Sequence, residues 1–374
     1  MEQVIQYAPS AEMILDPVRE MIYFDPSSCD FKTKCYLYVG TMLMGVWAAL
    51  FVHSKATRRK FVLLFYGMIV MIFTTDMSWK KKKVVKKLES VAHTKRVIFI
   101  RHGESMWNEA FNKSKNPVKF TYRVLKALLN ELLVLANFDS VLFDSPLNQE
   151  GFTQSKILKR ALTQSAVDDA EKDRYLKILN GDAGSSVLVS SNLRRAAQTA
   201  VVALWPRLEK SKDPVIVLPS LQEVSRNVDT LSIALPKTPI PLPGIEQELQ
   251  LEDGILDAAK VLDMSENTGN KPIFGNGKQR LEAFSRWVFE REEDTIIAAG
   301  HSLWFRHYFK TFLATEGLSD LEQDAKKYKM KNCGVVAFDL TTNATKDEFR
   351  IKPGSIYVVY EGFEKKEPKK KKKV

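Results

Sequence analysis

The sequence predicts an α/β domain, a three-layer α/β/α sandwich around a mostly parallel sheet, preceded by a two-helix hydrophobic membrane segment. The domain is predicted because short β-branched apolar runs alternate with segments of helical spacing. The membrane segment is predicted because two long uncharged runs lie near the N-terminus. The predicted strands are 96–100, 186–190, 214–218, 295–299, 334–340 and 355–360. The predicted helices between them are 121–137, 151–162, 192–208 and 278–292.

The composition is that of a folded chain. Of its 374 residues 45% are hydrophobic and 27% are charged, which excludes a disordered protein. An inserted lid is expected to be irregular, because four prolines fall between residues 236 and 243. The expected segments are a polar N-terminal segment 1–34, a membrane hairpin 35–79, a basic linker 80–94, a domain 95–362 that carries the lid 226–275, and a Lys-rich tail 363–374.

The net charge of +11 comes from two lysine clusters. Residues 80–87 hold six lysines and residues 365–373 hold seven, so the rest of the chain is close to neutral. A nucleic-acid partner is not expected, because proteins that bind nucleic acid carry their basic residues along one face of the folded domain. The chain has three cysteines without a Cys-x-x-Cys pair, and neither a metal site nor a cofactor is expected.

The two uncharged runs, 35–52 and 61–75, predict a membrane hairpin with membrane lipids as partners. Two buried core helices are the alternative. The lysines of 80–87 outnumber the basic residues of the short loop, so the loop is expected outside and the large C-terminal part in the cytosol. A hairpin that dips into one leaflet would instead bring 80–87 to anionic headgroups.

The tail allows three interpretations. Lys371 and Lys372 stand fourth and third from the end, which resembles a dilysine signal for retrieval to the endoplasmic reticulum. The same lysines resemble a nuclear import signal, and a solvated run of charge is the third interpretation. Together with a membrane hairpin, retrieval favours the endoplasmic reticulum or another endomembrane, with the catalytic domain in the cytosol.

Charged clusters follow four of the predicted strands. Ligands of an open α/β sheet bind at the carboxyl ends of the strands, so these clusters are expected to meet if the strands are neighbours. Cations that converge on one point need an anion, and phosphate suits arginine in particular. Helices that begin near Ser105, Ser191 and Ser302 are expected to direct free N–H groups at the same anion. The clusters occupy residues 101–108, 190–199, 221–223 and 300–302.

These clusters resemble the motifs of the histidine phosphatase superfamily, also called phosphoglycerate mutase-like. The resemblance covers residues 96–310, and the segment 144–151 resembles a further motif of the family. It implies that His102 accepts the phosphoryl group as phosphohistidine and that Glu223 protonates the leaving group. It also implies that the phosphoryl oxygens are held by Arg101, Arg195 and His301, with Asn108 near the phosphate. Arg194, next to the matching arginine, is expected to be a solvated helix residue.

The resemblance implies a metal-independent phosphomonoesterase that acts on a phosphorylated substrate. Mutases of the family carry extended substrate-binding blocks after the first motif and around the acid. The residues after Glu223 show no such block, which favours a phosphatase. Phosphoryl transfer of the phosphoglycerate mutase type is one alternative. A catalytically silent, membrane-anchored phosphate-binding protein is the other.

Overall fold

The computed structural model describes residues 31–365 except for 79–83, 114–115, 167 and 252–255. The chain divides into two compact units, residues 1–55 and residues 56–374. The described part of the first unit is α2 (Phe31–His53), and α3 (Lys55–Phe73) belongs to the second from Ala56 onwards. Most of the predicted segment 1–34, the lysines at 80–83, and Lys371 and Lys372 of the tail lie outside the described residues.

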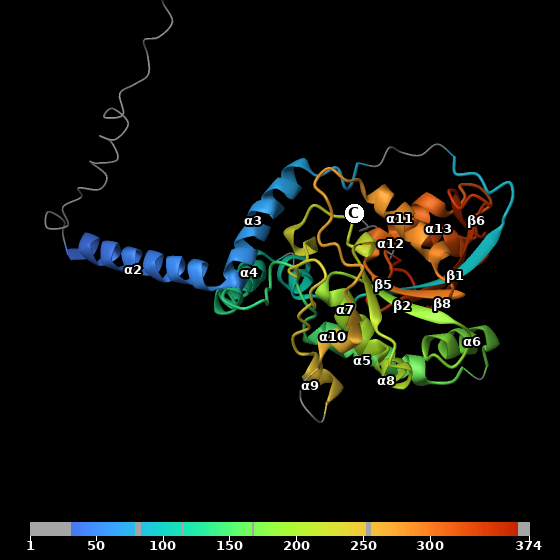
Figure 1. Cartoon of the computed structure of the whole chain (residues 1–374), viewed down its shortest axis with the longest axis horizontal. Coiled ribbons are helices and arrows are strands. Elements are labelled where there is room, and N and C mark those ends of the chain that lie inside the picture. The colour runs from blue at the N-terminus through green and yellow to red at the C-terminus, as the bar shows by residue number, and fades with distance from the viewer. Residues whose placement is uncertain (1–30, 79–83, 114–115, 167, 252–255, 366–374) are drawn as a thin grey trace, which may run out of the picture. The chain divides into compact units, whose positions relative to one another are not determined.

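An eight-stranded mixed sheet lies at the centre of the second unit (Figure 1). Its order is β4-β3-β2-β5-β1-β6-β7, with β8 paired to β6. Each predicted strand is present, and β4 and β7 were not predicted. The strands are β1 (His93–Arg101), β2 (Ser186–Ser191), β3 (Val215–Leu218), β4 (Leu262–Asp263), β5 (Thr295–Gly300), β6 (Val335–Thr342), β7 (Phe349–Ile351) and β8 (Tyr357–Tyr360).

The expectation of a mostly parallel sheet is correct for one side of the sheet only. From β4 to β1 all neighbours are parallel, whereas β6 is antiparallel to β1, and β7 and β8 are antiparallel to β6. The chain between β6 and β8 contains no crossover helix, which a return in the parallel direction needs. These last strands therefore fold back on their neighbours.

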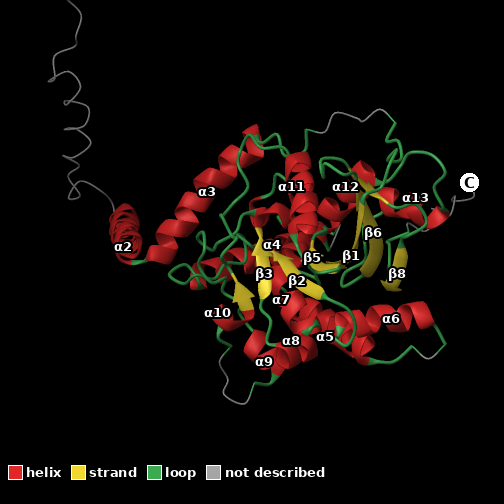
Figure 2. Ribbon diagram, turned by 45° about the vertical axis from the view of Figure 1, so that its right-hand side comes forward, coloured by secondary structure: helices red, strands yellow, loops and turns green. Residues whose placement is uncertain are grey.

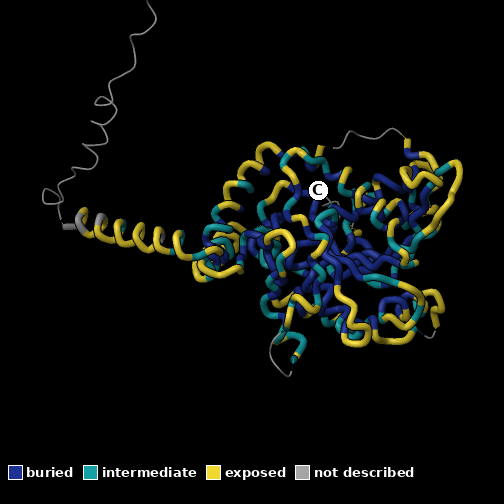
Figure 3. Tube along the Cα trace, viewed as in Figure 1, coloured by how far each residue is buried: buried dark blue, intermediate teal, exposed yellow. Residues whose placement is uncertain are grey.

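Helices cover both faces of the sheet and make the predicted three layers (Figure 2). Alternate residues of β1 divide between two cores: Ile98 and Ile100 join the core under one helix layer, and Val97 and Phe99 join the other. Figure 3 shows the sheet as the most deeply buried part of the unit. The first layer holds α5 (Gln149–Thr163), α6 (Ala170–Leu179), α7 (Arg194–Ala203) and α8 (Trp205–Ser211), and the second holds α11 (Gly277–Glu290), α12 (Ser302–Phe312) and α13 (Asp320–Lys327).

The predicted helix 192–208 is in fact two helices, because the chain turns at Leu204 between α7 and α8. Pro206 lies in the first turn of α8, where its missing N–H costs nothing, but inside one long helix it would remove a hydrogen bond. The predicted helix 121–137 is α4 (Pro117–Leu133), which begins earlier because Asn116 caps it: the Asn116 side chain accepts from the N–H groups of Val118 and Lys119.

The described residues of 226–275 are irregular, as predicted, and form just the short helices η4 (Val228–Thr230), α9 (Ile245–Leu249) and α10 (Ala258–Val261) before strand β4. The proline-rich stretch forms no strand. The segment is nevertheless well packed, since Leu231, Ile233 and Ile240 are fully buried. Its strand β4 also extends the sheet beyond β3.

The predicted membrane hairpin is wrong for its second helix. Within the described residues, no helix combines the length and apolarity needed to cross a bilayer. One face of α3 packs on the second unit, where Leu63 and Val70 join Phe143, Leu231 and Ile233 in a buried cluster. The buried residues of α3 recur at the spacing of one helix face: Ala56, Lys60, Leu63, Gly67 and Val70. Its opposite face is exposed, so α3 is a half-buried surface helix, and the alternative of a buried core helix is also wrong for it.

Hydrogen bonds and an ion pair also hold α3 against the rest of the second unit. The Arg59 guanidinium donates to the carbonyls of Ser232, Ile233 and Ala234 at 3.0–3.1 Å. The ammonium of Lys60 lies 3.1 Å from the carboxylate of Glu131 in α4. These contacts tie α3 to the segment 226–275 on one side and to α4 on the other.

A buried ionic cluster fastens the end of α3. The carboxylate of Asp76 contacts the ammonium of Lys271 at 2.9 Å and the guanidinium of Arg280 at 2.7 Å, and all three groups are largely removed from solvent. The Lys271 ammonium also donates to the backbone carbonyl of Glu223 at 2.8 Å. The chain after α3 is thereby joined to the loop that carries the predicted acid.

Candidate functional site

The sheet order places the four motif clusters side by side. The strands that precede them, β3, β2, β5 and β1, are consecutive parallel neighbours. Their carboxyl ends therefore lie along one edge of the sheet, visible in Figure 2 where these strands run together. The four strands are thus neighbours, which is the condition for the four clusters to meet.

His102 follows β1 directly and is 4% exposed. Its Nδ1 lies 2.6 Å from the carbonyl oxygen of Gly103, which can only accept, so Nδ1 carries the proton and Nε2 keeps its lone pair. Burial, and then the charges of Arg195 and Arg101, hold the pKa of His102 well below its usual range. The imidazole is thus neutral at pH 7, the state a nucleophile requires.

Close packing of glycines shapes the turn that holds His102. A Cβ on Gly151 would lie 2.0 Å from the carbonyl oxygen of Glu104, and one on Gly103 would lie 2.7 Å from the carbonyl oxygen of Gly151. The N–H of Gly103 donates to the Thr199 hydroxyl at 3.1 Å. The first motif therefore rests on α5 and α7 with no room for side chains at these two glycines.

His301 follows β5, is fully buried, and faces His102 with 5.1 Å between the ring centroids. Its Nε2 lies 2.9 Å from the hydroxyl of Ser191, at the end of β2. Its Nδ1 is buried and has no hydrogen-bond partner among the described residues. Burial, and then the charge of Arg195, hold the pKa of His301 well below its usual range.

The two predicted arginines differ in their partners. Arg195, in the first turn of α7, donates to the carbonyl of Asp229 at 3.0 Å and lies 3.4 Å from its carboxylate. Arg101 donates to the carbonyl of Met330 and to the half-exposed carboxylate of Glu364, the latter at 2.6 Å. Its buried Nε finds no partner in the described part of the chain.

Glu223 lies just after β3 at the N-terminus of α12. Its carboxylate accepts from the N–H groups of Trp304 at 2.8 Å and Leu303 at 3.3 Å. We expected the helix that begins near Ser302 to direct its free N–H groups at the bound phosphate. That expectation is wrong for Leu303 and Trp304, whose N–H groups donate to Glu223 instead. Burial nevertheless raises the pKa of Glu223, against the opposing charge of Arg195 and these hydrogen bonds. A carboxyl with a raised pKa suits a proton donor.

Two other predicted residues behave differently. The side-chain oxygen of Asn108, in the π-helix η2 (Asn108–Asn112), accepts from Asn112 at 2.8 Å, and its role near the phosphate stays a prediction. Arg194 is fully buried, which corrects the expectation of a solvated residue. Its guanidinium donates to the carbonyl of Asp144 at 2.7 Å and contacts the Asp139 carboxylate, so it braces the segment before α5.

Sequence reasoning missed three charged groups near the site. Lys329 lies close enough for its charge to contribute to the lowered pKa of His102, and Lys271 does the same for His301. The Glu364 carboxylate, which contacts Arg101, comes from the start of the predicted tail. None of them belongs to a motif, and all reach the site from segments far away in the sequence, so no local signal points to them.

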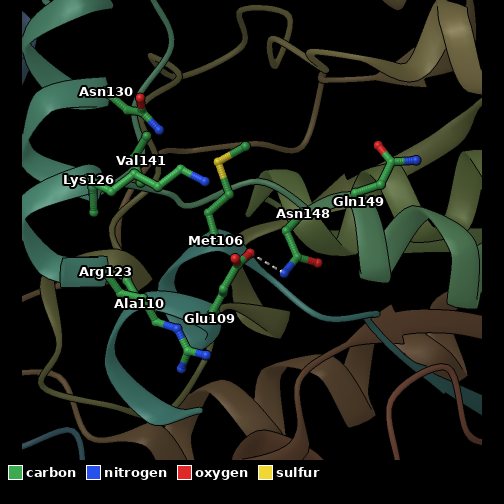
Figure 4. Close-up of a pocket in the computed structure, with 10 residues that line it drawn as sticks. Met106, Glu109, Ala110, Arg123, Lys126, Asn130, Val141, Asn148 and Gln149 are labelled. Atoms are coloured by element: carbon green, nitrogen blue, oxygen red, sulfur yellow. Dashed lines mark hydrogen bonds between the residues drawn. The ribbon is translucent and has the colours of Figure 1, made fainter. Parts of the chain in front are cut away.

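A separate cavity of about 270 Å³ lies beside the first motif (Figure 4). It opens between α4, η2 and the start of α5. In its wall the carboxylate of Glu109 accepts from the Asn148 side chain at 2.7 Å. Arg123 and Lys126 line it from α4, so this helix contributes basic side chains to the rim of the cavity. No group of metal-binding side chains was found among the described residues.

Comparison with known proteins gives similarity to solved structures only. No protein-family model matches the chain, and no curated protein does. The chain resembles a mycobacterial glucosyl-3-phosphoglycerate phosphatase at 13% identity, with 72% of this chain and 99% of that one covered and a TM-score of 0.34. It also resembles a phosphoglycerate mutase from Bacillus anthracis at 14% identity, with 71% and 95% covered and a TM-score of 0.34.

A third similar structure is an ecdysone phosphate phosphatase from the silkworm Bombyx mori, in complex with tungstate. Its identity to this chain is 14%, with 69% of this chain and 92% of that one covered and a TM-score of 0.33. These similar structures are phosphatases and a phosphoglycerate mutase. Similarity at this level says nothing about the activity of this chain, which has to be argued from the site itself.

Proposed function

We propose that the protein is a metal-independent phosphomonoesterase that works through a phosphohistidine on His102. The observation that carries the proposal is the pair of buried, neutral imidazoles of His102 and His301, 5.1 Å apart, with Arg195 as a charged neighbour of both. Two buried nitrogens that have no partner among the described residues, His301 Nδ1 and Arg101 Nε, are available as donors for the oxygens of a bound phosphoryl group.

In the proposed first step, the Nε2 lone pair of His102 attacks phosphorus and the bond from phosphorus to the leaving oxygen breaks. Glu223 supplies the proton that this oxygen needs. In the second step water attacks phosphorus, Glu223 takes a proton from the water, and the phosphorus–nitrogen bond breaks to release phosphate. Arg195 balances the phosphoryl charge throughout.

The test uses the full chain with an aryl phosphate substrate in the presence of a chelator. We expect release of the phenol, and an acid-labile, alkali-stable phosphoryl group trapped on the wild-type protein. His102→Ala removes both. The matched control is His93→Ala, because His93 lies at the other, exposed end of the same strand and should be silent.

Other outcomes would replace the proposal. Phosphoryl exchange between positions of a phosphoglycerate, without net release of phosphate, would indicate the mutase alternative. Binding of phosphate with no turnover across sugar, inositol, lipid and peptide phosphates would indicate the silent phosphate-binding protein.

We also propose that the protein works at a membrane, with the endoplasmic reticulum or another endomembrane as its location and the catalytic unit in the cytosol. Residues 31–75 contain six Lys and Arg and no Asp or Glu, a composition that suits anionic lipid. Lys371 and Lys372 support retrieval. Imaging of the full chain, with both lysines replaced by serine as the comparison, tests this: unchanged localisation of the variant would rule out retrieval by the tail.

A further inference from the structure

Helix α4 presents its apolar side to solvent. The eight large apolar side chains that it exposes are between 39% and 77% accessible. Six of them recur at the spacing of one helix face, opposite the buried Ala127. An apolar face on a surface helix normally turns inward, and here it turns outward. The outward stripe consists of Val118, Tyr122, Leu125, Leu129, Leu132 and Leu133.

Helix α3 adds a second exposed apolar face. One side of α3 packs on the rest of the second unit. The other side exposes Val62, Phe65, Ile69, Ile72 and Phe73. Figure 3 shows exposed turns along this helix. The two helices are joined, because Lys60 of α3 pairs with Glu131 of α4, and the Thr57 hydroxyl donates to the carbonyl of Leu135 at 3.1 Å. The two exposed apolar faces therefore belong to neighbouring helices of one unit.

The exposed charges that these two helices themselves carry are basic. Helix α3 contains no acidic residue, and of its four basic ones Arg59 and Lys60 bond within the unit, whereas Lys55 is exposed and Arg58 is half-buried. In α4 the only acidic residue is Glu131, which is buried and paired with Lys60, whereas Lys119 and Lys126 are exposed. A second copy of the chain related by a twofold axis would bring these basic borders toward each other. An anionic lipid surface would instead neutralise them, because its headgroups attract basic residues.

We propose that the exposed faces of α3 and α4 seat the catalytic unit on the surface of an anionic lipid bilayer. Both helices would lie in the plane of the interface, with the apolar stripe between the acyl chains and the lysines among the headgroups. This differs from a spanning hairpin, since neither helix needs to cross. It extends the proposed membrane location and is independent of the phosphatase chemistry.

The first experiment measures whether α4 itself enters the bilayer, independently of any membrane contact made by other segments. The full chain carries Cys29→Ser and Cys35→Ser together with either Leu125→Cys or Leu129→Cys. The introduced cysteine carries an environment-sensitive fluorophore. Cys333 is buried, and burial raises its pKa to about 12, so it does not compete for the label. The matched control is the same label at Ile157, an exposed apolar residue of α5.

Vesicles of phosphatidylcholine and phosphatidylserine with a nitroxide on the acyl chain are then added. We expect a blue shift and strong quenching at Leu125 and Leu129, and neither at Ile157. Protein that floats with the vesicles while all three labels stay in water would overturn the proposal, since another segment would then make the contact. Energy transfer between labels on α4 without vesicles would assign the face to a second copy and would overturn it too.

A second experiment removes the apolar stripe. The double variant Leu125→Glu and Leu129→Glu should weaken binding to the same vesicles about a hundredfold, because two leucine side chains no longer enter the acyl region. Ile157→Glu is the control and should bind as the wild type does. Hydrolysis of a soluble aryl phosphate should be unchanged in both variants. Unchanged vesicle binding by the double variant would contradict the proposal, while loss of hydrolysis in every protein would concern the proposed function alone.

Discussion

The imidazole rings of His102 and His301 lie 5.1 Å apart at the ends of two adjacent parallel strands. Both are buried, and the charge of Arg195 lowers the pKa of both. Each arginine of the site already has a carboxylate partner: Asp229 lies 3.4 Å from Arg195, and Glu364 lies 2.6 Å from Arg101. Under the proposed function, the phosphoryl group would share or replace these partners.

The stability of the folded protein should depend on these histidines in acid. Because the folded-state pKa of each lies well below the unfolded value of 6.5, the unfolded chain binds more protons once the pH falls below 6.5. The stability is fully present above that pH and is lost below it, by up to about 1.4 kcal/mol per pH unit for each histidine. Denaturant unfolding of His102→Gln should show a smaller loss between about pH 6.5 and pH 5. An equal loss in His102→Gln and in the exposed control His93→Gln would contradict this account.

Glu223 should matter most for poor leaving groups. Glu223→Gln keeps the size of the side chain and removes the proton, so hydrolysis of an alkyl phosphate should fall about 10²–10⁴-fold. A nitrophenyl phosphate, whose leaving oxygen needs little protonation, should be affected much less. Because burial raises the pKa of Glu223, wild-type activity should persist above the usual carboxyl range and fall as the pH rises through that pKa. Equal losses for both leaving groups would argue against a proton donor at this position.

Adjacent arginines should give different phenotypes. Arg194 is a buried brace for Asp139 and the backbone at Asp144, so Arg194→Met should lower the free energy of unfolding by about 3 kcal/mol or more. Arg195→Met should also destabilise, because it leaves the buried Asp229 carboxylate without its partner, but it alone should raise KM and weaken inhibition by phosphate. Denaturant unfolding and steady-state kinetics of the two variants separate the effects. Kinetics of Arg194→Met that match those of Arg195→Met would place both side chains at the phosphate.

Glu364 should compete with phosphate for Arg101. Its carboxylate contacts the Arg101 guanidinium at 2.6 Å and is itself 49% exposed, so it can move away. Glu364→Gln should therefore lower the inhibition constant for inorganic phosphate by roughly two- to tenfold, since the arginine is no longer neutralised. The control Glu361→Gln removes a nearby carboxylate that pairs with Lys331 instead. Weaker inhibition in Glu364→Gln would show that Arg101 needs this carboxylate for its position.

The grouping of the candidate site residues could be predicted from the sequence because these residues follow strands. Once β1, β2, β3 and β5 are neighbours, the residues directly after them are brought to one edge by topology alone. His102, Arg195 and His301 needed no further information. The carboxylate of Glu223 was harder, because its orientation depends on the N–H groups of Leu303 and Trp304. Those contacts come from tertiary packing and have no counterpart in the local sequence.

Burial of charge was the main thing the sequence did not reveal. Arg194 and Lys271 look like ordinary surface residues, and their partners Asp144 and Asp76 lie far away along the chain. The fate of α3 was misjudged for a related reason. A helix that is apolar on most sides can pack against lipid or against protein. In α3 the hydrogen bonds of Arg59 and the ion pair of Lys60 with other segments identify protein as the neighbour.

The packing of α3 also determines how far toward the N-terminus the chain must extend for the second unit to keep its buried surfaces covered. A shortened protein that starts after the hydrophobic runs, for instance at residue 88, would lose Leu63 and Val70 and leave Leu231 and Ile233 without their cover. The ammonium of Lys271 would remain buried without the Asp76 carboxylate, next to the backbone of Glu223. The hydrophobic stretch that seems easiest to remove is thus a helix whose loss would expose a buried face of the second unit.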